Sequence, residues 1–232
     1  MKLTNRNLWS ALLGLSLAAC GPMDEAELEP PAQQEQELPA GCTSVASTTM
    51  TTHACFHYNT SGDNITVAAS ATRTTSAAGI NTKHRHYTVN LPSGAEGSVT
   101  FVPAATTAGD TTESVAFYLS PSATFTLLTS GGTTVAPGIN QTFTSSCGLS
   151  KAVVYDLNVG STYILAMGPV AGNQVRVVPE YLDDNRVRWY RDADGDTYGS
   201  STNSVLTACE PASGYVNRRF DCNDNDPNLF NC

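Results

Sequence analysis

Acidic side chains gather in two short strips near the carboxyl end of the chain, and the first strip has the spacing of a metal-binding loop. Asp192, Asp194 and Asp196 occupy alternate positions, and a main-chain carbonyl follows at Tyr198. Calcium takes about six to eight oxygen ligands in flexible geometry, which alternate carboxylates of one loop can supply in part. The bidentate glutamate of an EF-hand is replaced by Asn203. The first strip therefore needs ligands from another part of the chain.

The second strip, residues 221–226, offers those ligands. We expect a disulfide between Cys209 and Cys222 to bring it back over the first strip. Carboxylates gathered in this way repel one another unless a cation lies between them. The sequence therefore predicts a calcium-stabilised module at residues 183–232. The second strip contributes the oxygen-bearing side chains Asp221, Asn223, Asp224 and Asp226.

The stretch from Tyr190 to Pro227 resembles a known family motif. Its segments YRDADGDTYG, ACEPASGYV and DCNDNDP follow the order and spacing of the MopE-type metal-binding motif of bacterial surface proteins. The first segment is also similar to the calcium loops of thrombospondin type 3 repeats. The family name suggests copper, whereas a ligand set made only of oxygen atoms favours calcium. The ligands that the resemblance implies are Asp192, Asp194, Asp196, Asp221, Asp224 and Asp226.

Two of the four histidines suggest an alternative metal site. His84 and His86 are two residues apart on an expected strand, so both side chains would leave the same face. With His57, or with the thiol of Cys55, they would suit copper or zinc. The competing interpretation is a pair of solvated strand-end residues whose two basic neighbours oppose a metal ion. The sequence leaves both open.

Familiar catalytic motifs are missing from the sequence. It contains no G-x-S-x-G elbow, no H-E-x-x-H, no phosphate-binding glycine loop and no C-x-x-C. We therefore expect no enzymatic activity, no catalytic residue and no organic cofactor. A secreted hydrolase, as a catalytic or an accessory domain, is the alternative, because a triad is set by geometry rather than by order in the chain.

The overall charge excludes another class of function. The chain has 12 basic and 21 acidic residues among 232, which gives a net charge of -9. A nucleic-acid-binding surface needs clustered lysine and arginine, and no run of the sequence supplies it. We expect no nucleic-acid partner.

The amino-terminal residues carry the pattern of an exported lipoprotein. Two basic residues precede an uncharged run at residues 8–19, which is too short to span a bilayer but suits a signal peptide. The run ends in Leu-Ala-Ala-Cys20, which resembles the bacterial lipobox. The resemblance implies cleavage after residue 19, acylation of Cys20 and an anchor of lipid alone. Gly21, where an aspartate often signals inner-membrane retention, favours the outer membrane.

Residues 20–40 are expected to tether the folded part to that anchor. Between residues 21 and 40 the sequence has four prolines, six acidic residues and no basic residue. Such a composition buries too little apolar surface to offset the entropy of ordering. We expect a disordered acidic linker.

From residue 41 onward, apolar residues recur at period two between turn-forming clusters, which is typical of strands with one buried face. Short strands with glycine and proline turns predict an all-β domain over residues 41–182, an antiparallel β-sandwich or jelly-roll-like fold. The eight expected strands are residues 65–71, 87–91, 99–101, 115–119, 125–127, 153–157, 163–167 and 175–177.

Six cysteines remain besides Cys20. In an exported chain, an even number of cysteines predicts disulfides. We favour Cys209 with Cys222, as above, and Cys42 with either Cys55 or Cys147. The third pairing stays open.

Together these patterns predict a lipid-anchored protein of the outer membrane or cell surface. Its expected role is binding or structural, with calcium stabilising the C-terminal module. The lipid would engage the membrane, and a surface protein or a glycan is the expected class of further partner. Copper or zinc carriage by His57, His84 and His86 is the first alternative function.

Overall fold

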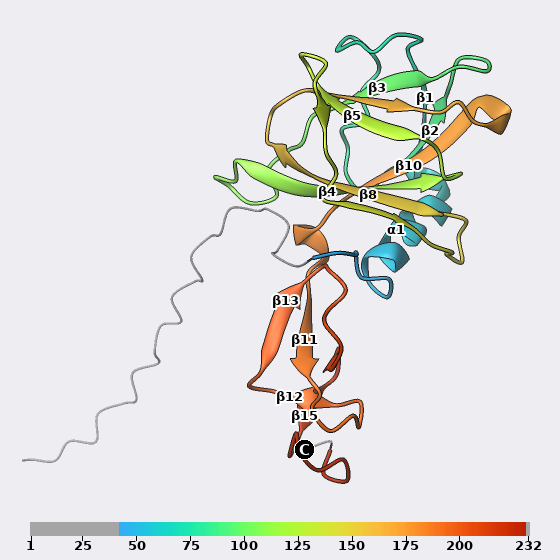
Figure 1. Cartoon of the computed structure of the whole chain (residues 1–232). Coiled ribbons are helices and arrows are strands. Elements are labelled where there is room, and N and C mark those ends of the chain that lie inside the picture. The colour runs from blue at the N-terminus through green and yellow to red at the C-terminus, as the bar shows by residue number, and fades with distance from the viewer. Residues whose placement is uncertain (1–41, 231–232) are drawn as a thin grey trace, which may run out of the picture. The chain divides into compact units, whose positions relative to one another are not determined.

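The structure is a computed structural model, and it describes residues 42–230 (Figure 1). The expected signal peptide, the lipid anchor at Cys20 and the acidic linker lie outside the described residues. Within the described part of the chain, no helix has both the length and the apolar character needed to cross a membrane.

Ten strands between residues 64 and 181 form two sheets. All eight expected strands are present, and two short strands, near residues 134 and 139, were not predicted. The strands are β1 (Asn64–Ala68), β2 (His86–Asn90), β3 (Gly97–Phe101), β4 (Thr112–Ser120), β5 (Phe125–Thr129), β6 (Thr134–Val135), β7 (Ile139–Thr142), β8 (Lys151–Asn158), β9 (Tyr163–Met167) and β10 (Gln174–Tyr181).

The two sheets pack face to face as a β-sandwich, which confirms the predicted fold class. One sheet has six strands in the order β1-β2-β10-β4-β8-β7, and the other has four in the order β3-β9-β5-β6. Alternate side chains of the facing strands fill the core between them, among them Phe117 of β4, Tyr155 of β8 and Leu165 of β9. The pairings are antiparallel except that β1 runs parallel to β2.

A helix that the sequence patterns did not predict covers the outer face of the six-stranded sheet. Figure 1 shows α1 (Met50–Asn59) on the side of β4, β8 and β10 that faces away from β3 and β5. Met50 and Ala54, one helical turn apart, pack against Tyr118 and Val178 of that face. The central strands are therefore buried on both faces, so apolar residues also occupy their outward positions.

The C-terminal module consists of short strands and turns. A three-stranded sheet has the order β13-β11-β14, and a two-stranded sheet pairs β12 with β15. Their bounds are β11 (Val187–Arg191), β12 (Gly199–Ser200), β13 (Ser204–Thr207), β14 (Tyr215–Val216) and β15 (Arg219–Asp221). Single 3₁₀ turns occur at η1 (Ser61–Asp63), η2 (Ala171–Asn173) and η3 (Asp183–Asn185).

The disulfide pairings differ from those expected. Cys42 is bonded to Cys209, and Cys55 to Cys147. The predicted pairing of Cys209 with Cys222 is wrong, as is that of Cys42 with Cys55 or Cys147; Cys222 is disulfide-bonded, but not to Cys209.

The backbone explains the first of these pairings. The main chain of residues 44–46 pairs with that of residues 208–210, with an N–H of Ala46 donating to Ala208 at 2.9 Å and an N–H of Glu210 donating to Ser44 at 2.9 Å. This pairing brings Cys42 beside Cys209 across a separation of 167 residues, which no local pattern in the sequence encodes. The bond covalently joins the first described residues to the C-terminal module.

Glu113 is an acid buried within the sandwich. Its side chain lies on β4 and is fully inaccessible. One carboxylate oxygen accepts the N–H of Thr106, and the other has no hydrogen-bond partner among the described residues. Burial raises the pKa of Glu113 above its ordinary value, although the bond from Thr106 opposes the shift. The charged form of Glu113 therefore destabilises the fold.

This arrangement predicts a pH-dependent stability. A raised pKa means that the folded chain holds a proton that the unfolded chain has already lost, so stability falls as pH rises from the ordinary glutamate value of 4.5 through the folded pKa. We expect Glu113→Gln to raise the melting temperature by about 2–4 °C at pH 8, which corresponds to about 1 kcal/mol. Thermal scans should show this gain disappearing below pH 4.

The matched control is Glu96→Gln, which removes an exposed ion pair with Arg73. Exposed pairs contribute about 1 kcal/mol or less, so this variant should be neutral or slightly less stable. A Glu113→Gln variant that melts below the unchanged chain at pH 8 would contradict the prediction.

Candidate metal centres

Three histidines and one glutamate, from three separate segments, converge beside helix α1. Each of His53, His57, His84 and Glu180 offers one ligand atom, and these four atoms lie within 4.8 Å of one another. Two histidines come from α1, one from the loop before β2, and the glutamate from β10. The ring centroids of the three histidines are separated by 4.7 to 5.2 Å.

Helix α1 fixes the first pair. His53 and His57 are four residues apart, so they project from one face of the helix at successive turns. Their Nε2 atoms are 3.3 Å apart. The His53 side chain is 37% exposed and that of His57 is 13% exposed, so the pair lies at the rim of the protein surface.

Strand β10 places Glu180 beneath the histidines. Val178 packs in the core under α1, and by the period-two rule Glu180 faces the same side of the sheet. Glu180 Oε2 lies 3.1 Å from His53 Nδ1 and 2.8 Å from His84 Nδ1, while Oε1 is buried and has no partner among the described residues. Burial alone would raise the pKa of Glu180, but the bonds to the two imidazoles hold it below its ordinary value. Glu180 is therefore a buried carboxylate in its charged form.

The loop before β2 turns His84 toward that carboxylate. His84 has a φ of 57°, in the left-handed region that few residues other than glycine adopt, and its N–H donates to the Pro179 carbonyl at 3.2 Å. Its Nε2 lies 3.3 Å from Asp184 Oδ2. The hydrogen bond to Glu180 is the main cause that raises the pKa of His84, although burial opposes it.

A second layer of carboxylates orients the cluster and pairs with its basic neighbours. Asp63 Oδ2 lies 2.8 Å from His57 Nδ1, and Asp63 Oδ1 accepts a 2.6 Å bond from Arg85. Lys83 Nζ lies 2.6 Å from Asp184 Oδ2. The bond to His57 is the main cause that lowers the pKa of Asp63. The two basic side chains that could oppose a metal ion are thus each paired with a carboxylate.

Two residues of the predicted histidine site do not belong to this cluster. His86 begins β2 and its ring stacks on Tyr58, with centroids 4.7 Å apart. Burial, and next the charge of Arg176, lower the pKa of His86. His84 precedes the strand in a left-handed conformation, so the expected strand pair of His84 and His86 is wrong. Cys55 is in a disulfide and offers no thiolate.

Sequence reasoning missed His53 and Glu180. The four-residue spacing of His53 and His57 was the available signal, because it places two imidazoles on one face if the segment is helical. The segment carries no pattern that predicts a helix, so this spacing alone does not indicate a cluster. Nothing in the sequence around residue 180 indicates that its carboxylate contacts His53 of a helix, 127 residues earlier.

The first acidic strip forms a compact loop in which main-chain N–H groups donate to at least one oxygen of each aspartate. Both Asp192 oxygens accept such bonds, from Gly195 at 2.7 Å and Thr197 at 3.1 Å. Asp194 Oδ1 accepts from residue 196, and Asp196 Oδ1 accepts from residue 198. Ligand atoms of the three aspartates lie within 4.8 Å of one another. The loop geometry thus directs the three side chains inward.

The second strip meets this loop, as expected, but through backbone pairing. Strand β12, directly after the first strip, runs parallel to β15, which ends in Asp221. The N–H of Ala193 donates to Asp224 Oδ1 at 2.8 Å. Burial, then the neighbouring charges of Asp194 and Asp196, raise the pKa of Asp221. Three buried oxygens have no hydrogen-bond partner among the described residues: Asp194 Oδ2, Asp196 Oδ2 and Asp221 Oδ2.

The remaining expected ligands have other contacts. Asp226 Oδ1 accepts bonds from Asn228, and the Asn223 carbonyl accepts two main-chain N–H groups of its own turn. The Tyr198 ring stacks on Phe230, with centroids 5.3 Å apart. Roles for the Tyr198 carbonyl and for Asn223 and Asp226 as ligands stay predictions.

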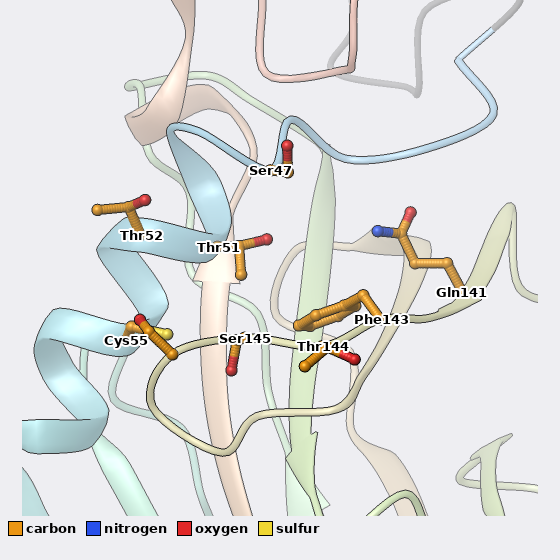
Figure 2. A pocket seen from close by; sticks show the side chains of 9 residues that line it. Ser47, Thr51, Thr52, Cys55, Gln141, Phe143, Thr144 and Ser145 are labelled. Carbon is orange, nitrogen blue, oxygen red and sulfur yellow. The ribbon is translucent and has the colours of Figure 1, made fainter.

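A pocket of about 240 Å³ lies on another side of α1. Figure 2 shows Thr51, Thr52 and Cys55 from the helix opposite Phe143, Thr144 and Ser145 from the chain after β7. Its lining has no charged or histidine side chain, and it is smaller than the roughly 300–1,000 Å³ typical of small-molecule sites. It offers no residue for acid–base or metal chemistry.

No protein-family model and no curated protein sequence matches this chain. The lipobox and the metal-motif resemblances are therefore carried by the residues quoted above.

Close packing at Gly199 generates a prediction for the C-terminal module. A Cβ at this position would lie 2.5 Å from Tyr190 Cβ and 2.8 Å from the Tyr190 carbonyl oxygen. We expect Gly199→Ala to destabilise the module by about 1–3 kcal/mol, as overpacking typically does. Urea unfolding monitored by tyrosine and tryptophan emission measures this loss.

The control is Gly131→Ala, where the nearest neighbouring atom to an added Cβ, Thr129 Oγ1, lies 3.8 Å away. This variant should unfold at the urea concentration of the unchanged chain. Equal effects of the two substitutions would show that Gly199 is not a packing constraint.

Proposed function

We propose that the chain is a lipid-anchored protein of the bacterial outer membrane or cell surface, of binding or structural type, whose C-terminal module is stabilised by calcium. The proposal assigns it no catalytic role. Its further partner would be a surface protein or a glycan, met by the sandwich or the module outside the membrane.

The arrangement of the two acidic strips is the observation that carries this proposal. Asp194, Asp196 and Asp221 each have a buried oxygen without a hydrogen-bond donor among the described residues, and the charges of Asp194 and Asp196 act on Asp221. None of the ion pairs among residues 42–230 involves these aspartates. Buried charged oxygens without donors are costly, and a bound cation removes that cost.

The chemistry of the ligands favours calcium. All the expected metal-ligand atoms are carboxylate or carbonyl oxygens, which suit calcium and magnesium rather than copper or zinc. Calcium tolerates irregular geometry, whereas magnesium demands a near-octahedral site and keeps several waters. An irregular loop completed by a second strip therefore suits calcium better.

Export is supported by the disulfides. Cys42–Cys209 and Cys55–Cys147 lie in the described part of the chain, and such bonds persist in oxidising compartments rather than in the cytosol. Together with the lipobox-like sequence that ends at Cys20, they support a location outside the inner membrane.

The first test of this proposal is calcium-dependent stability. At ~1 mM calcium and a Kd of about 10⁻⁴ to 10⁻³ M, the ion should stabilise the fold by about 0.4–1.4 kcal/mol. We expect the melting temperature of the module to rise on addition of calcium and to return after addition of a calcium-selective chelator. Scanning calorimetry measures both changes.

A matched pair of variants makes the test specific. The double substitution Asp194→Asn with Asp196→Asn keeps the loop hydrogen bonds to side-chain oxygens but removes two charges, and it should abolish the calcium-dependent shift. The control Asp110→Asn changes a half-buried aspartate that accepts the N–H of Thr107 in its own turn, and it should leave the shift unchanged. A melting temperature indifferent to calcium in the unchanged chain would refute the calcium module.

The second test concerns the anchor. We expect Cys20→Ala to move the protein from the membrane fraction to the soluble fraction, because the proposed anchor consists of the acyl chains on that residue. Fractionation followed by mass spectrometry of the amino-terminal peptide measures this. Recovery of the Cys20→Ala variant in the membrane fraction, at the level of the unchanged protein, would argue against lipid anchoring.

A further inference from the structure

We propose that His53, His57, His84 and Glu180 bind one divalent transition-metal ion, zinc, at a site separate from the acidic strips. The site combines three imidazole nitrogens with one carboxylate oxygen. It differs from the histidine site expected from the sequence, because His53 and Glu180 replace His86 and the Cys55 thiol. This inference does not depend on the calcium module.

Hydrogen bonding leaves two lone pairs facing each other. A carboxylate only accepts hydrogen bonds, so His57 must donate from Nδ1 to Asp63 and His53 from Nδ1 to Glu180. In the neutral rings, both Nε2 atoms are then acceptors. They lie 3.3 Å apart, where two acceptors repel unless a cation lies between them.

The spacing of these nitrogens matches a tetrahedral metal ion. Zinc–nitrogen bonds are about 2.0–2.1 Å long, which places neighbouring ligand atoms of a tetrahedron about 3.3–3.4 Å apart. The Nε2 atoms of His53 and His57 are already at this distance. One ligand atom each of His84 and Glu180 lies within 4.8 Å of ligand atoms of the other two residues. Metal binding would exchange a present bond of His84, to Glu180 or to Asp184, for a bond to the ion.

Glu180 provides an independent indication of a bound cation. Its carboxylate side chain is fully inaccessible, yet its Oε1 has no partner among the described residues. A buried charge of this kind is normally compensated by a cation or by a complete set of hydrogen bonds. A metal ion held jointly with the histidines would compensate it.

Neighbouring carboxylates orient the histidines of the cluster and add negative charge around it. Metal-binding histidines usually donate their other ring nitrogen to a carboxylate, which fixes the ring and its tautomer. Asp63 accepts this hydrogen bond from His57, and its other oxygen accepts a bond from Arg85. Lys83 is paired with Asp184. The carboxylates of the site are Glu180, Asp63 and Asp184, one more than its basic side chains, Lys83 and Arg85. The site is therefore suited to a cation.

Zinc fits this ligand set better than calcium. Imidazole nitrogen is a ligand for zinc, copper, iron and nickel, whereas calcium takes oxygen ligands. Zinc takes three or four ligands of this kind in tetrahedral geometry, whereas copper(II) prefers a tetragonal arrangement. The 3.3 Å spacing of the two Nε2 atoms suits the tetrahedral ion. We therefore expect the acidic strips to bind calcium and the histidine cluster to bind zinc.

The experiment measures zinc binding by the full chain, purified in detergent and stripped of metal. Competition with a chromophoric zinc chelator should give one zinc per chain, unaffected by excess calcium. His57→Ala and His84→Ala should each lower the affinity at least 10-fold. The control His86→Ala removes the histidine that stacks on Tyr58 and should retain full affinity.

A positioning variant separates a metal site from a merely structural cluster. Asp63→Asn keeps a side-chain oxygen near His57 but removes the charge, and loss of such partners typically costs about 10–100-fold in metal affinity. Cobalt(II) added in place of zinc should give the intense visible bands of a tetrahedral ion. A weak octahedral spectrum, or binding of copper but not zinc, would overturn the tetrahedral zinc assignment.

Failure of this inference and failure of the calcium module are distinguishable. The double variant Asp194→Asn with Asp196→Asn should lose the calcium effect and keep zinc binding, whereas His57→Ala should do the reverse. Unchanged zinc affinity in folded His57→Ala and His84→Ala variants, with melting curves taken to establish folding, would overturn the site.

Discussion

The packing of α1 on the outer face of the six-stranded sheet is the constraint on which the rest of the sandwich depends. Met50, Ala54 and Cys55 anchor the helix, and the Cys55–Cys147 disulfide ties it to the chain before β8. This cover removes Glu180 from water while leaving its charge in place. The burial of that charge explains why three imidazoles gather around it, because only cationic or donating groups stabilise a carboxylate there.

The same physical problem recurs in the C-terminal module with different groups. There, carboxylates lie close together and none of the ion pairs of residues 42–230 includes them, so in the proposed function calcium supplies the compensating charge. In the proposed zinc site, three imidazoles lie beside one buried carboxylate, that of Glu180. Hard oxygen ligands in one place and imidazoles in the other would let one exported protein hold two kinds of ion without exchange between the sites.

The backbone pairing of residues 44–46 with residues 208–210, closed by Cys42–Cys209, connects these two regions of the chain. The long interval between its cysteines removes much conformational freedom from the unfolded chain, which stabilises the fold. The module is thus held by a covalent bond and by main-chain hydrogen bonds as well as by its own short strands. Calcium would add to that stability rather than create it.

The strands of the sandwich followed from the sequence, because period-two alternation acts within a few residues. Val115, Phe117 and Leu119 were expected to share a face and do. The acidic loop was predicted on the same local basis, since three aspartates at alternate positions of a turn converge wherever the loop is placed. The meeting of its second strip was expected correctly, but from a disulfide that does not form.

The tertiary structure decided what depends on contacts between distant segments. Helix α1 has no strong pattern of its own and is stabilised by the sheet beneath it, so the four-residue spacing of His53 and His57 acquired meaning only with the fold. Glu180 and the disulfide pairings likewise depend on which strands become neighbours. The sequence by itself determined most strands of the sandwich and the acidic loop, because these are local, whereas the imidazole–carboxylate cluster arises from segments that only folding brings together.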